Sequence, residues 1–458
     1  MAGIGFELER SLKKDSLVSY AKVYSYAAVL SSGAWIISIV SIIIVGYISL
    51  NSYRNTQETI QFQLIITYAF MFSSSFMLSG FLQLPLTRFI ADRIYAKEYD
   101  EILPAYFATI FVVLVAGLFI MAPVTFYLLP EKSLFFKFLT LLVFIVVSLV
   151  WIANVLASSL KRYKAVVSSY FITYSSIIAL AYFFGENTTF LLGAFFIGNF
   201  VLFMILTLLI LKQYPSKKLV SFRIFSIKSF YWRLAASGFF YNLGVWIDKI
   251  IFWYHPMTGY YVVGKFKASI VYDLPIFLAY LAIIPGMAIL FYRLEVNFSR
   301  SFQGFYSAIT NAQPLSTITH YKNAMNNDVR TVIKEILIVQ TVINIFLYNA
   351  APYIFEKLSI PNLYLDLFYI LLIGATLQLC FMTMQALLFY IDKRIQTLYL
   401  SMLFLVLNAL FSYISIDMGP EYFGYGYALS LLIVFIISVF VVREKFWKID
   451  YETFMLQK

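Results

Sequence analysis

Charged residues, cysteine and histidine are all scarce in this chain of 458 residues. Lysine, arginine, aspartate and glutamate make up 12% of the chain, whereas soluble domains carry about 25%. The only cysteine is Cys380, which excludes a disulfide framework within the chain. The two histidines, His255 and His320, provide no credible metal cluster. Enzyme classes that depend on cysteine–histidine pairs or on histidine-rich metal sites are therefore disfavoured.

Apolar residues are abundant instead: 62% of the chain is hydrophobic and 19% is aromatic, more than a soluble core can hide. Most of the apolar windows reach the roughly 20 residues that a helix needs to cross a bilayer. The windows lie near residues 24–50, 62–86, 105–129, 134–158, 166–184, 189–211, 234–254, 268–291, 332–354, 364–390, 397–416 and 424–442. We therefore expect an all-α polytopic membrane protein with about 12 transmembrane helices. The short polar break at Glu186 and Asn187 predicts a tight hairpin between two of them.

The first 22 residues differ from the windows that follow. They carry seven ionisable residues, with Ile4, Leu8 and Leu12 at helical spacing. They lack the apolar core of a signal peptide. This pattern predicts an amphipathic helix that lies on the membrane surface.

The basic residues lie mainly on one side of the predicted membrane. Counted along alternate connections, 27 of the 34 lysines and arginines fall on the side of the N-terminus. Basic loops stay in the cytoplasm, so we expect both termini to be cytoplasmic. The asymmetry also accounts for the formal charge of +11 without a nucleic-acid partner.

Six helices return the chain to its starting side, so two halves of six helices would share one orientation. A faint internal register agrees: Ser237 and Arg293 follow Ser32 and Arg88 at the same spacing of 205 residues. We expect two six-helix lobes related by an axis along the membrane normal. The predicted parts are the amphipathic segment 1–23, an N-lobe 24–211, a basic cytoplasmic linker 212–233, a C-lobe 234–442 with a cytoplasmic insertion 292–331, and a cytoplasmic tail 443–458.

Charges lie inside the two windows that begin the second lobe. A charge at the centre of a membrane helix costs about 2.5 to 3.5 kcal/mol, so these side chains require a partner or a function. One interpretation is a structural tie between Lys249 and Asp273 with tryptophans over the lysine stem, which leaves Asp248 without an evident partner. The other interpretation places Asp248 or Asp273 on a water-filled path, where the carboxylate meets a sugar, an amine or a proton. The candidate path residues are Asp248, Lys249, Asp273, Trp246, Asn242, Arg88 and Arg293.

Pro275, Pro285 and Gly286 interrupt the window near residues 268–291. Proline removes a backbone hydrogen bond and kinks a helix, which neighbouring helices can accommodate as plain architecture. Transporters also place hinges and binding sites at discontinuous helices. We therefore take these residues as a candidate hinge.

The insertion 292–331 is the only sizeable segment predicted outside the membrane. Phe302, Phe305 and Ile309 recur at helical spacing before Pro314. These residues predict either surface helices that lie against the bilayer or a docking platform for a cytoplasmic partner, with Phe302 and Phe305 as docking residues.

The stretch GYYVVGK at residues 259–265 matches part of a phosphate-binding loop. Phe266 occupies the position at which serine or threonine would hold magnesium, and the predicted topology places the loop outside the cell. We expect no nucleotide, no other cofactor and no metal. Transport would then draw on an ion gradient, a bound partner or the synthesis of the substrate.

Several stretches together resemble the PelG family. The stretches that carry the resemblance are MAGIGFELERSL, YSYAAVLSSGAW, LTRFIADRIYAKEYDEILPA, GVWIDKIIFW, YDLPIFLAYLAIIPGMAILFYRLE, LLFYIDKR and YFGYGYA. They run in order from residue 1 to beyond residue 425. The resemblance implies the fold of the multidrug, oligosaccharidyl-lipid and polysaccharide exporter superfamily, with two lobes around a central cavity and alternating access.

The same resemblance implies a non-enzymatic transporter of the Pel exopolysaccharide, a biofilm polymer, in the bacterial cytoplasmic membrane. Implied partners are a cytoplasmic glycosyltransferase and membrane subunits that include a cyclic-di-GMP receptor. Two alternatives stay open, a flippase for lipid-linked oligosaccharide and an ion-coupled exporter of small molecules. A membrane glycosyltransferase would need acidic residues on a catalytic loop, and the short external loops argue against that enzyme class.

Overall fold

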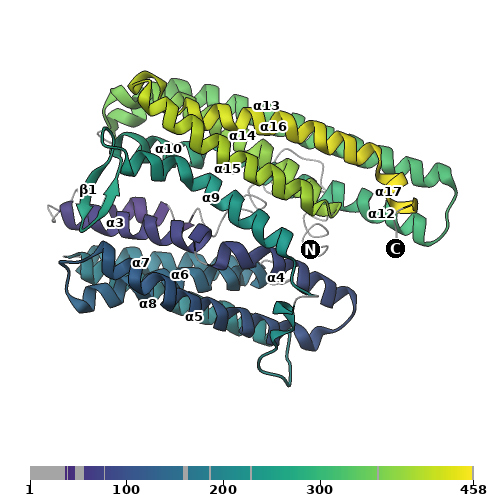
Figure 1. Ribbon diagram of the computed structural model, residues 1–458, viewed down its shortest axis with the longest axis horizontal. Coiled ribbons are helices and arrows are strands. Elements are labelled where there is room, and N and C mark those ends of the chain that lie inside the picture. Colours follow the sequence, from purple (N-terminus) through teal and green to yellow (C-terminus); the bar gives the residue numbers. More distant parts are fainter. Residues whose placement is uncertain are drawn as a thin grey trace. The chain divides into compact units, whose positions relative to one another are not determined.

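The computed structural model describes residues 37–38, 40–46, 56–76, 78–157, 163–184, 187–226, 229–357 and 360–455. This described part is almost entirely helical and contains one two-stranded sheet. It falls into two compact units, a first unit within Ala34–Ile270 and a second unit within Val271–Lys458. Figure 1 shows the elements of both units.

Long helices that run roughly parallel and antiparallel to one another build the first unit (Figure 1). The elements are α3 (Thr56–Met71), the π-helical segment η1 (Phe72–Phe76), α4 (Leu78–Tyr95), η2 (Tyr99–Glu101), α5 (Ile102–Leu128), α6 (Leu134–Ala157), α7 (Tyr163–Phe184), α8 (Thr188–Gln213), η3 (Phe222–Phe225), α9 (Trp232–Tyr254), β1 (Tyr260–Val263) and β2 (Phe266–Ala268).

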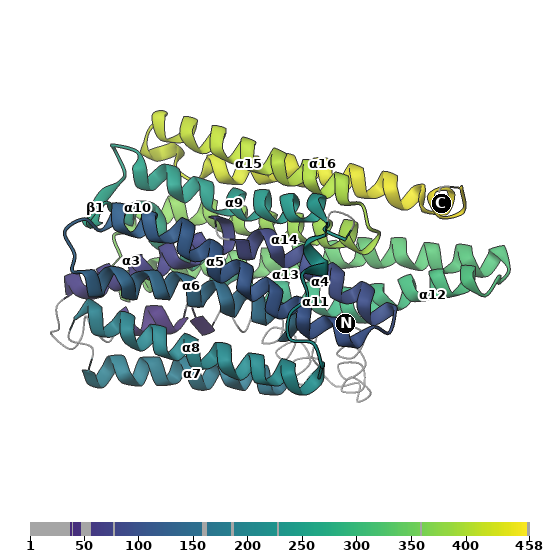
Figure 2. The same cartoon turned by 60° about the horizontal axis from the view of Figure 1, so that its bottom comes forward.

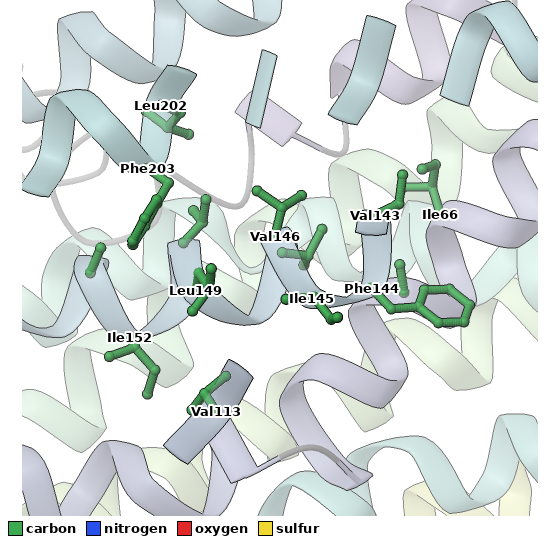
Figure 3. Close-up of a cluster of buried hydrophobic side chains, with 14 of the residues drawn as sticks. Ile66, Val113, Val143, Phe144, Ile145, Val146, Leu149, Ile152, Leu202 and Phe203 are labelled. Carbon is green, nitrogen blue, oxygen red and sulfur yellow. The ribbon is translucent and has the colours of Figure 1, made fainter. Parts of the chain in front are cut away.

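Helix α6 forms the centre of this unit. Apolar side chains cover it on all sides, which is typical of a helix surrounded by other helices. In Figure 3, Phe144 and Ile152 of α6 lie among side chains of other helices, Ile66 of α3, Val113 of α5 and Leu202 of α8. The core of the first unit is therefore a helical layer packed around α6.

The two strands form an antiparallel hairpin directly after α9. Gly264 in its turn has a φ of 54°, a backbone conformation that glycine adopts easily. The N–H of Lys265 donates to the carbonyl of Leu128 at 2.7 Å, which fastens the turn to the end of α5. The stretch that resembled part of a phosphate-binding loop is thus the first strand and turn of a short β-hairpin.

The second unit is also a helical bundle. Its elements are α10 (Ile270–Ala282), α11 (Ile284–Tyr292), the π-helical segment η4 (Arg293–Phe298), α12 (Ser299–Thr310), α13 (Leu315–Lys357), η5 (Asn362–Tyr364), α14 (Leu365–Tyr390), α15 (Arg394–Asp417), η6 (Pro420–Tyr422), α16 (Tyr425–Trp447) and α17 (Ile449–Met455). Helix α14 is the most enclosed of these, since it packs against both α13 and α16. Most of its side chains are accordingly buried.

The predicted windows and the observed helices coincide closely. In the described part, nine helices are long and apolar enough to cross a membrane. Every window after the first overlaps a helix, although two helical segments on either side of η1 share the second window. The first window is described only at residues 37–38 and 40–46, and the predicted amphipathic segment lies outside the described residues. The count of 12 and the side of the termini stay predictions.

The insertion 292–331 contains helix α12 and the beginning of α13. Helix α13 starts at Leu315, directly after Pro314, and continues without a break to Lys357. At 1.5 Å per residue its 43 residues span about 65 Å, roughly twice the hydrocarbon thickness. Figure 2 shows α12 beside the first turns of α13 as a projecting hairpin. The second helix of this segment is thus continuous with a predicted span, and the surface position and the docking role both stay predictions.

Helix α9 belongs to the first unit, because it packs against α4 and η1. The sequence placed the division between lobes earlier, at the linker 212–233. A lobe boundary set by membrane topology stays a prediction. The first unit nevertheless contains both Asp248 and Lys249, whereas Asp273 belongs to the second unit.

Candidate functional site

A buried ion pair lies within α9. The ammonium nitrogen of Lys249 is 3.2 Å from Oδ2 of Asp248, and both side chains are almost fully buried, with exposed fractions of 1% and 0%. Neighbouring residues in a helix do not face each other, so the lysine must curl back to reach its partner. The same nitrogen donates to the carbonyl of Val245 at 2.8 Å. Asp248, to which the sequence assigned no evident partner, therefore pairs with the next residue along the chain.

An aromatic ring lies beside the ammonium group of Lys249. The ammonium nitrogen lies 5.7 Å from the ring centroid of Trp246, an arrangement that favours a cation–π interaction. Trp246 and Trp253 lie 6.3 Å apart, and Trp253 stacks on Tyr68 of α3 at 4.6 Å. These rings exclude water from one side of the charge pair, which strengthens its attraction.

The π-helical segment η1 contacts α9 beside this ion pair. The indole N–H of Trp246 donates to the hydroxyl of Ser74 in η1 at 2.9 Å. Single π-helical turns are rare inside helices and are frequent at functional sites. Sequence reasoning missed this segment, and the only signal was the run of three serines, FSSSF, inside an apolar window.

Helices α4 and α9 approach each other closely beside this segment. A Cβ atom on Gly238 would lie 2.8 Å from the carbonyl oxygen of Gly80, so only glycine fits there. One turn further along α9, the amide of Asn242 donates to the carbonyl of Gly238 at 2.8 Å. The described part thus brings Asn242, Trp246 and the charge pair together on α9.

Asp273 lies in the first turn of α10 and is half-buried. It belongs to the second unit, and the tie between Lys249 and Asp273 stays a prediction. Negative charge is favourable in the first turn of a helix, where backbone N–H groups lack partners. That position gives Asp273 a structural role at the start of α10 in addition to any role in transport.

The candidate hinge contains a break in the helix, but at only one of its two prolines. Pro275 lies inside α10, which continues without interruption to Ala282. Helix α11 starts at Ile284, and Pro285 occupies its first turn. The break therefore falls at Ile283, directly before Pro285.

Gln340 of α13 closes this break. With its amide oriented to satisfy both groups, its nitrogen donates to the carbonyl of Ala282 and its oxygen accepts from the N–H of Gly286, each at 3.2 Å. The side chain is fully buried. A Cβ atom on Gly286 would lie 2.4 Å from the side-chain amide of Gln340, so a larger residue there would displace this amide. Sequence reasoning missed Gln340, whose signal was a single glutamine within the apolar run LIVQTVINI.

The two candidate arginines at the ends of spans are both paired. Arg88 contacts Asp92 one turn along α4, with 3.2 Å between Nε and Oδ1. Arg293 binds Glu335 of α13 through two nitrogens, and its Nε lies 2.7 Å from Oε2. Arg88 therefore pairs within its own helix, whereas Arg293 joins η4 to α13.

Phe302 and Phe305 lie inside the second unit. Phe305 is fully buried, and the half-buried Phe302 packs on Tyr306 and Tyr390 with ring centroids 4.7 and 5.8 Å away. These rings join α12 to the end of α14. A docking partner therefore cannot contact Phe305 directly, because the side chain stabilises the hairpin from within.

Most hydroxyl side chains inside the helices donate to the backbone of their own helix, as Thr109 and Thr140 do, and a few polar side chains join neighbouring helices. Tyr174 donates to Asn199 at 3.2 Å in the first unit, and Gln385 donates to Ser401 at 3.1 Å in the second. Within the described residues, no group of three or more histidine, cysteine, aspartate or glutamate side chains is arranged to hold a metal ion.

An ionic cluster fastens the last helix, α17, to the second unit. Glu452 accepts hydrogen bonds from Lys393 at the start of α15 and from Lys445 of α16. Asp450 pairs with Lys322 of α13. Burial acts to raise the pKa of the Glu452 carboxyl, but the two lysines outweigh it, so the pKa lies below its ordinary value.

Solved structures share this fold. An outward-facing multidrug resistance transporter of the MATE family in the MOP superfamily superposes with a TM-score of 0.65 at 14% identity, over 93% of this chain and 96% of that chain. A MOP superfamily transporter from Pyrococcus furiosus gives 0.63 at 12% identity, over 93% and 96%. An inward-facing MATE transporter gives 0.59 at 13% identity, over 91% and 98%. The chain therefore has the fold of this class of multi-pass membrane transporters.

No curated protein matches the chain significantly. The PelG family, described as "Putative exopolysaccharide Exporter (EPS-E)", matches residues 1–454. The chain belongs to the PelG family. Fold and family together identify a membrane transporter involved in the export of exopolysaccharide.

Proposed function

We propose that this protein moves a Pel-type exopolysaccharide across the bacterial cytoplasmic membrane. The observation that supports this most strongly is the family match, which extends over residues 1–454. The transporter fold agrees with it. Both termini lie in the cytoplasm in this proposal, as the distribution of basic residues predicts.

The polar face of α9 is the proposed contact for the polymer. Asp248 and Lys249 are buried as a pair in this structure, so in this proposal their carboxylate and ammonium groups meet the polymer only when the surrounding helices part during transport. Trp246 and Asn242 lie on the same helix. Sugar hydroxyls can both donate to the carboxylate and accept from the ammonium group. Indole rings pack against the apolar faces of sugar rings. This set of groups suits a neutral, hydroxyl-rich chain better than a small apolar compound.

The proposed energy source is synthesis of the polymer itself. A cytoplasmic glycosyltransferase would feed the growing chain into the transporter, and a membrane subunit that binds cyclic-di-GMP would regulate it. The projecting hairpin of α12 and α13 is the proposed docking site for this synthase. Leu315 lies at its turn and is exposed, whereas Phe305 is enclosed.

Secretion of the polymer tests the path. Neutralising Asp248 or Asp273 to asparagine should reduce secretion per amount of folded protein, because each carboxylate is proposed to meet the substrate. Asp366→Asn, at an exposed position in the first turn of α14, serves as the matched control. Secretion at the wild-type level in both path variants would show that these residues do not form the path.

Co-purification tests the docking site separately. Leu315→Asp should reduce recovery of the glycosyltransferase with the transporter, because it places a charge on the exposed turn of the hairpin. Phe305→Asp should instead lower the stability of the transporter itself. Unchanged recovery with Leu315→Asp would place the synthase elsewhere.

An ion-coupled exporter of small molecules is the second candidate, and the likeness to multidrug transporters favours it. In vesicles that contain only the purified protein, such an exporter would move small cations when an ion gradient is imposed. Export of polymer that depends on synthesis would not respond to the gradient. A flippase for lipid-linked oligosaccharide would be revealed by the accumulation of lipid-linked intermediates when the protein is absent.

A further inference from the structure

The connection between α8 and α9 is fastened to the first unit at several points. Lys218 pairs with Glu101 at 2.9 Å, and Arg223 pairs with Glu98 at 3.3 Å. The N–H of Ser221 donates to the carbonyl of Pro104 in α5 at 3.1 Å. The segment from Lys212 to Phe225, named the strap below, therefore has a defined position against the start of α5. Figure 1 shows it as the teal loop that extends away from the helices of the first unit.

The strap exposes apolar side chains although it lies outside the spans. Leu219 has an exposed fraction of 76% and Phe222 one of 50%, and Val220 between them is also exposed. A soluble loop rarely exposes several large apolar residues in succession. This face of the strap is therefore a candidate surface for contact with lipid or protein.

The apolar face of the strap continues the lipid-facing surface of α5. The ring of Phe222 lies 6.0 Å from the ring of Phe111, edge to face. Phe111 is exposed and lies nine residues after Ile102, or about 13 Å along the helix. Leu118 and Phe119 continue the exposed apolar surface further along α5. The strap thus borders the part of α5 that must face acyl chains in a multi-pass protein.

Positive charge flanks this apolar face. Lys212 and Lys217 are exposed, and no ion pair is seen for either within the part of the chain that the structure describes. Of the nearby acids, Glu98 pairs with Arg93 and Arg223 and Glu101 pairs with Lys218, whereas Asp100 is exposed beside the strap. The four lysines and arginines of the strap outnumber these three acids. Apolar side chains that insert beside exposed lysines are typical of segments that bind the surface of anionic membranes.

We infer that the strap binds anionic lipid of the leaflet on its own side of the membrane. Leu219, Val220 and Phe222 insert at the level of the headgroups, and Lys212 and Lys217 contact lipid phosphates. The bilayer is favoured over a protein partner because the apolar face of the strap is continuous with the lipid-facing surface of α5. The inference is independent of the transported substrate.

Labelling of a single cysteine tests the insertion. Cys380 is buried, so Leu219→Cys provides an accessible thiol for an environment-sensitive fluorophore on the full-length protein. Leu315→Cys is the matched control, because the Leu315 side chain has a similar exposed fraction, 72%, but lies on the projecting hairpin. In vesicles of phosphatidylcholine with phosphatidylglycerol, the label at residue 219 should emit at shorter wavelength than the label at 315 and should be quenched by brominated lipid. A label at 219 that behaves like the label at 315 would overturn the inference.

The lysines have a test of their own. Native mass spectrometry of the protein extracted from mixed vesicles should find phosphatidylglycerol enriched over phosphatidylcholine. The double variant Lys212→Gln with Lys217→Gln should reduce this enrichment by about five-fold per lysine. The control pair, Lys97→Gln with Lys334→Gln, removes two exposed lysines outside the strap and should leave the enrichment unchanged. An equal loss of phosphatidylglycerol enrichment in both pairs of variants would contradict lipid binding at the strap. A label at residue 219 that is shielded from solvent only after the glycosyltransferase is added would contradict it as well.

Discussion

Gln340 replaces the backbone hydrogen bonds that are missing where α10 ends and α11 begins, through its contacts with Ala282 and Gly286. A break in a membrane helix leaves polar backbone groups that neither lipid nor water can satisfy. A side chain from a neighbouring helix satisfies them here. The same contact couples the break to α13.

Replacing Gln340 with leucine should destabilise the second unit. The change leaves a buried carbonyl and a buried N–H without partners, at a cost of about 1 to 3 kcal/mol each. Thermal unfolding of the purified protein in detergent measures the loss. Gln313→Leu, at the exposed turn between α12 and α13, is the control and should have little effect. Equal stability of the two variants would show that Gln340 does not support the break.

Replacing Gly286 with alanine should also lower stability, because the new methyl group would lie 2.4 Å from both Gln340 and Leu379. Gly193→Ala in α8 provides the opposite control. A Cβ atom there meets nothing within 4 Å, so the change should stabilise α8 by up to about 1 kcal/mol. Melting temperatures that shift in the same direction for both variants would contradict the close packing at Gly286.

The ion pair in α9 can be separated from its proposed role in transport. Removing one member of a buried pair costs about 3 to 5 kcal/mol, whereas replacing both with uncharged residues is often nearly neutral. Asp248→Asn and Lys249→Met should therefore each reduce stability, and the double variant should recover most of it. If the pair contacts the polymer, secretion stays low in the double variant. Full recovery of both stability and secretion would assign the pair a purely structural role.

The cluster around Glu452 predicts a dependence of stability on pH. The pKa of this carboxyl is lowered in the folded protein, so its contribution is present above the ordinary value of 4.5 and is lost as the pH falls below it. Glu452→Gln should lower the melting temperature at neutral pH, and the difference from wild type should shrink in acid. Glu444→Gln removes a more exposed pair with Lys448 and should change little. A difference that is independent of pH would contradict the pairing of Glu452.

Much of the fold could be predicted from the apolar windows. A stretch such as residues 134–158 is apolar on every side, and a bilayer or a surrounding bundle is the only environment that accommodates it. The windows therefore predicted most of the observed helices, although α13 begins 17 residues before its window and two windows each contain a broken helix. Family resemblance added the superfamily fold, which the solved structures confirm.

The details of the candidate site were harder to predict, because they depend on contacts between helices. Spacing along α9 separates Asp248 from Lys249 by about 100°, so sequence reasoning sought a partner for the lysine on another helix. It could not anticipate that the lysine curls back to the preceding residue. The π-helical turn at Ser74 and the support of Gln340 likewise follow from packing, which leaves little periodic signal in the sequence.

The continuity of α13 has a mechanical consequence. The turn of the projecting hairpin at Leu315 and the support of the break at Gln340 lie about 38 Å apart on one unbroken helix. An α-helix of this length behaves as a stiff rod, since its hydrogen bonds fix every backbone dihedral. A tilt of about 5° at one point displaces the far end of such a rod by several ångströms. Whatever pushes on the hairpin outside the membrane therefore moves a lever whose other arm reaches the break between α10 and α11.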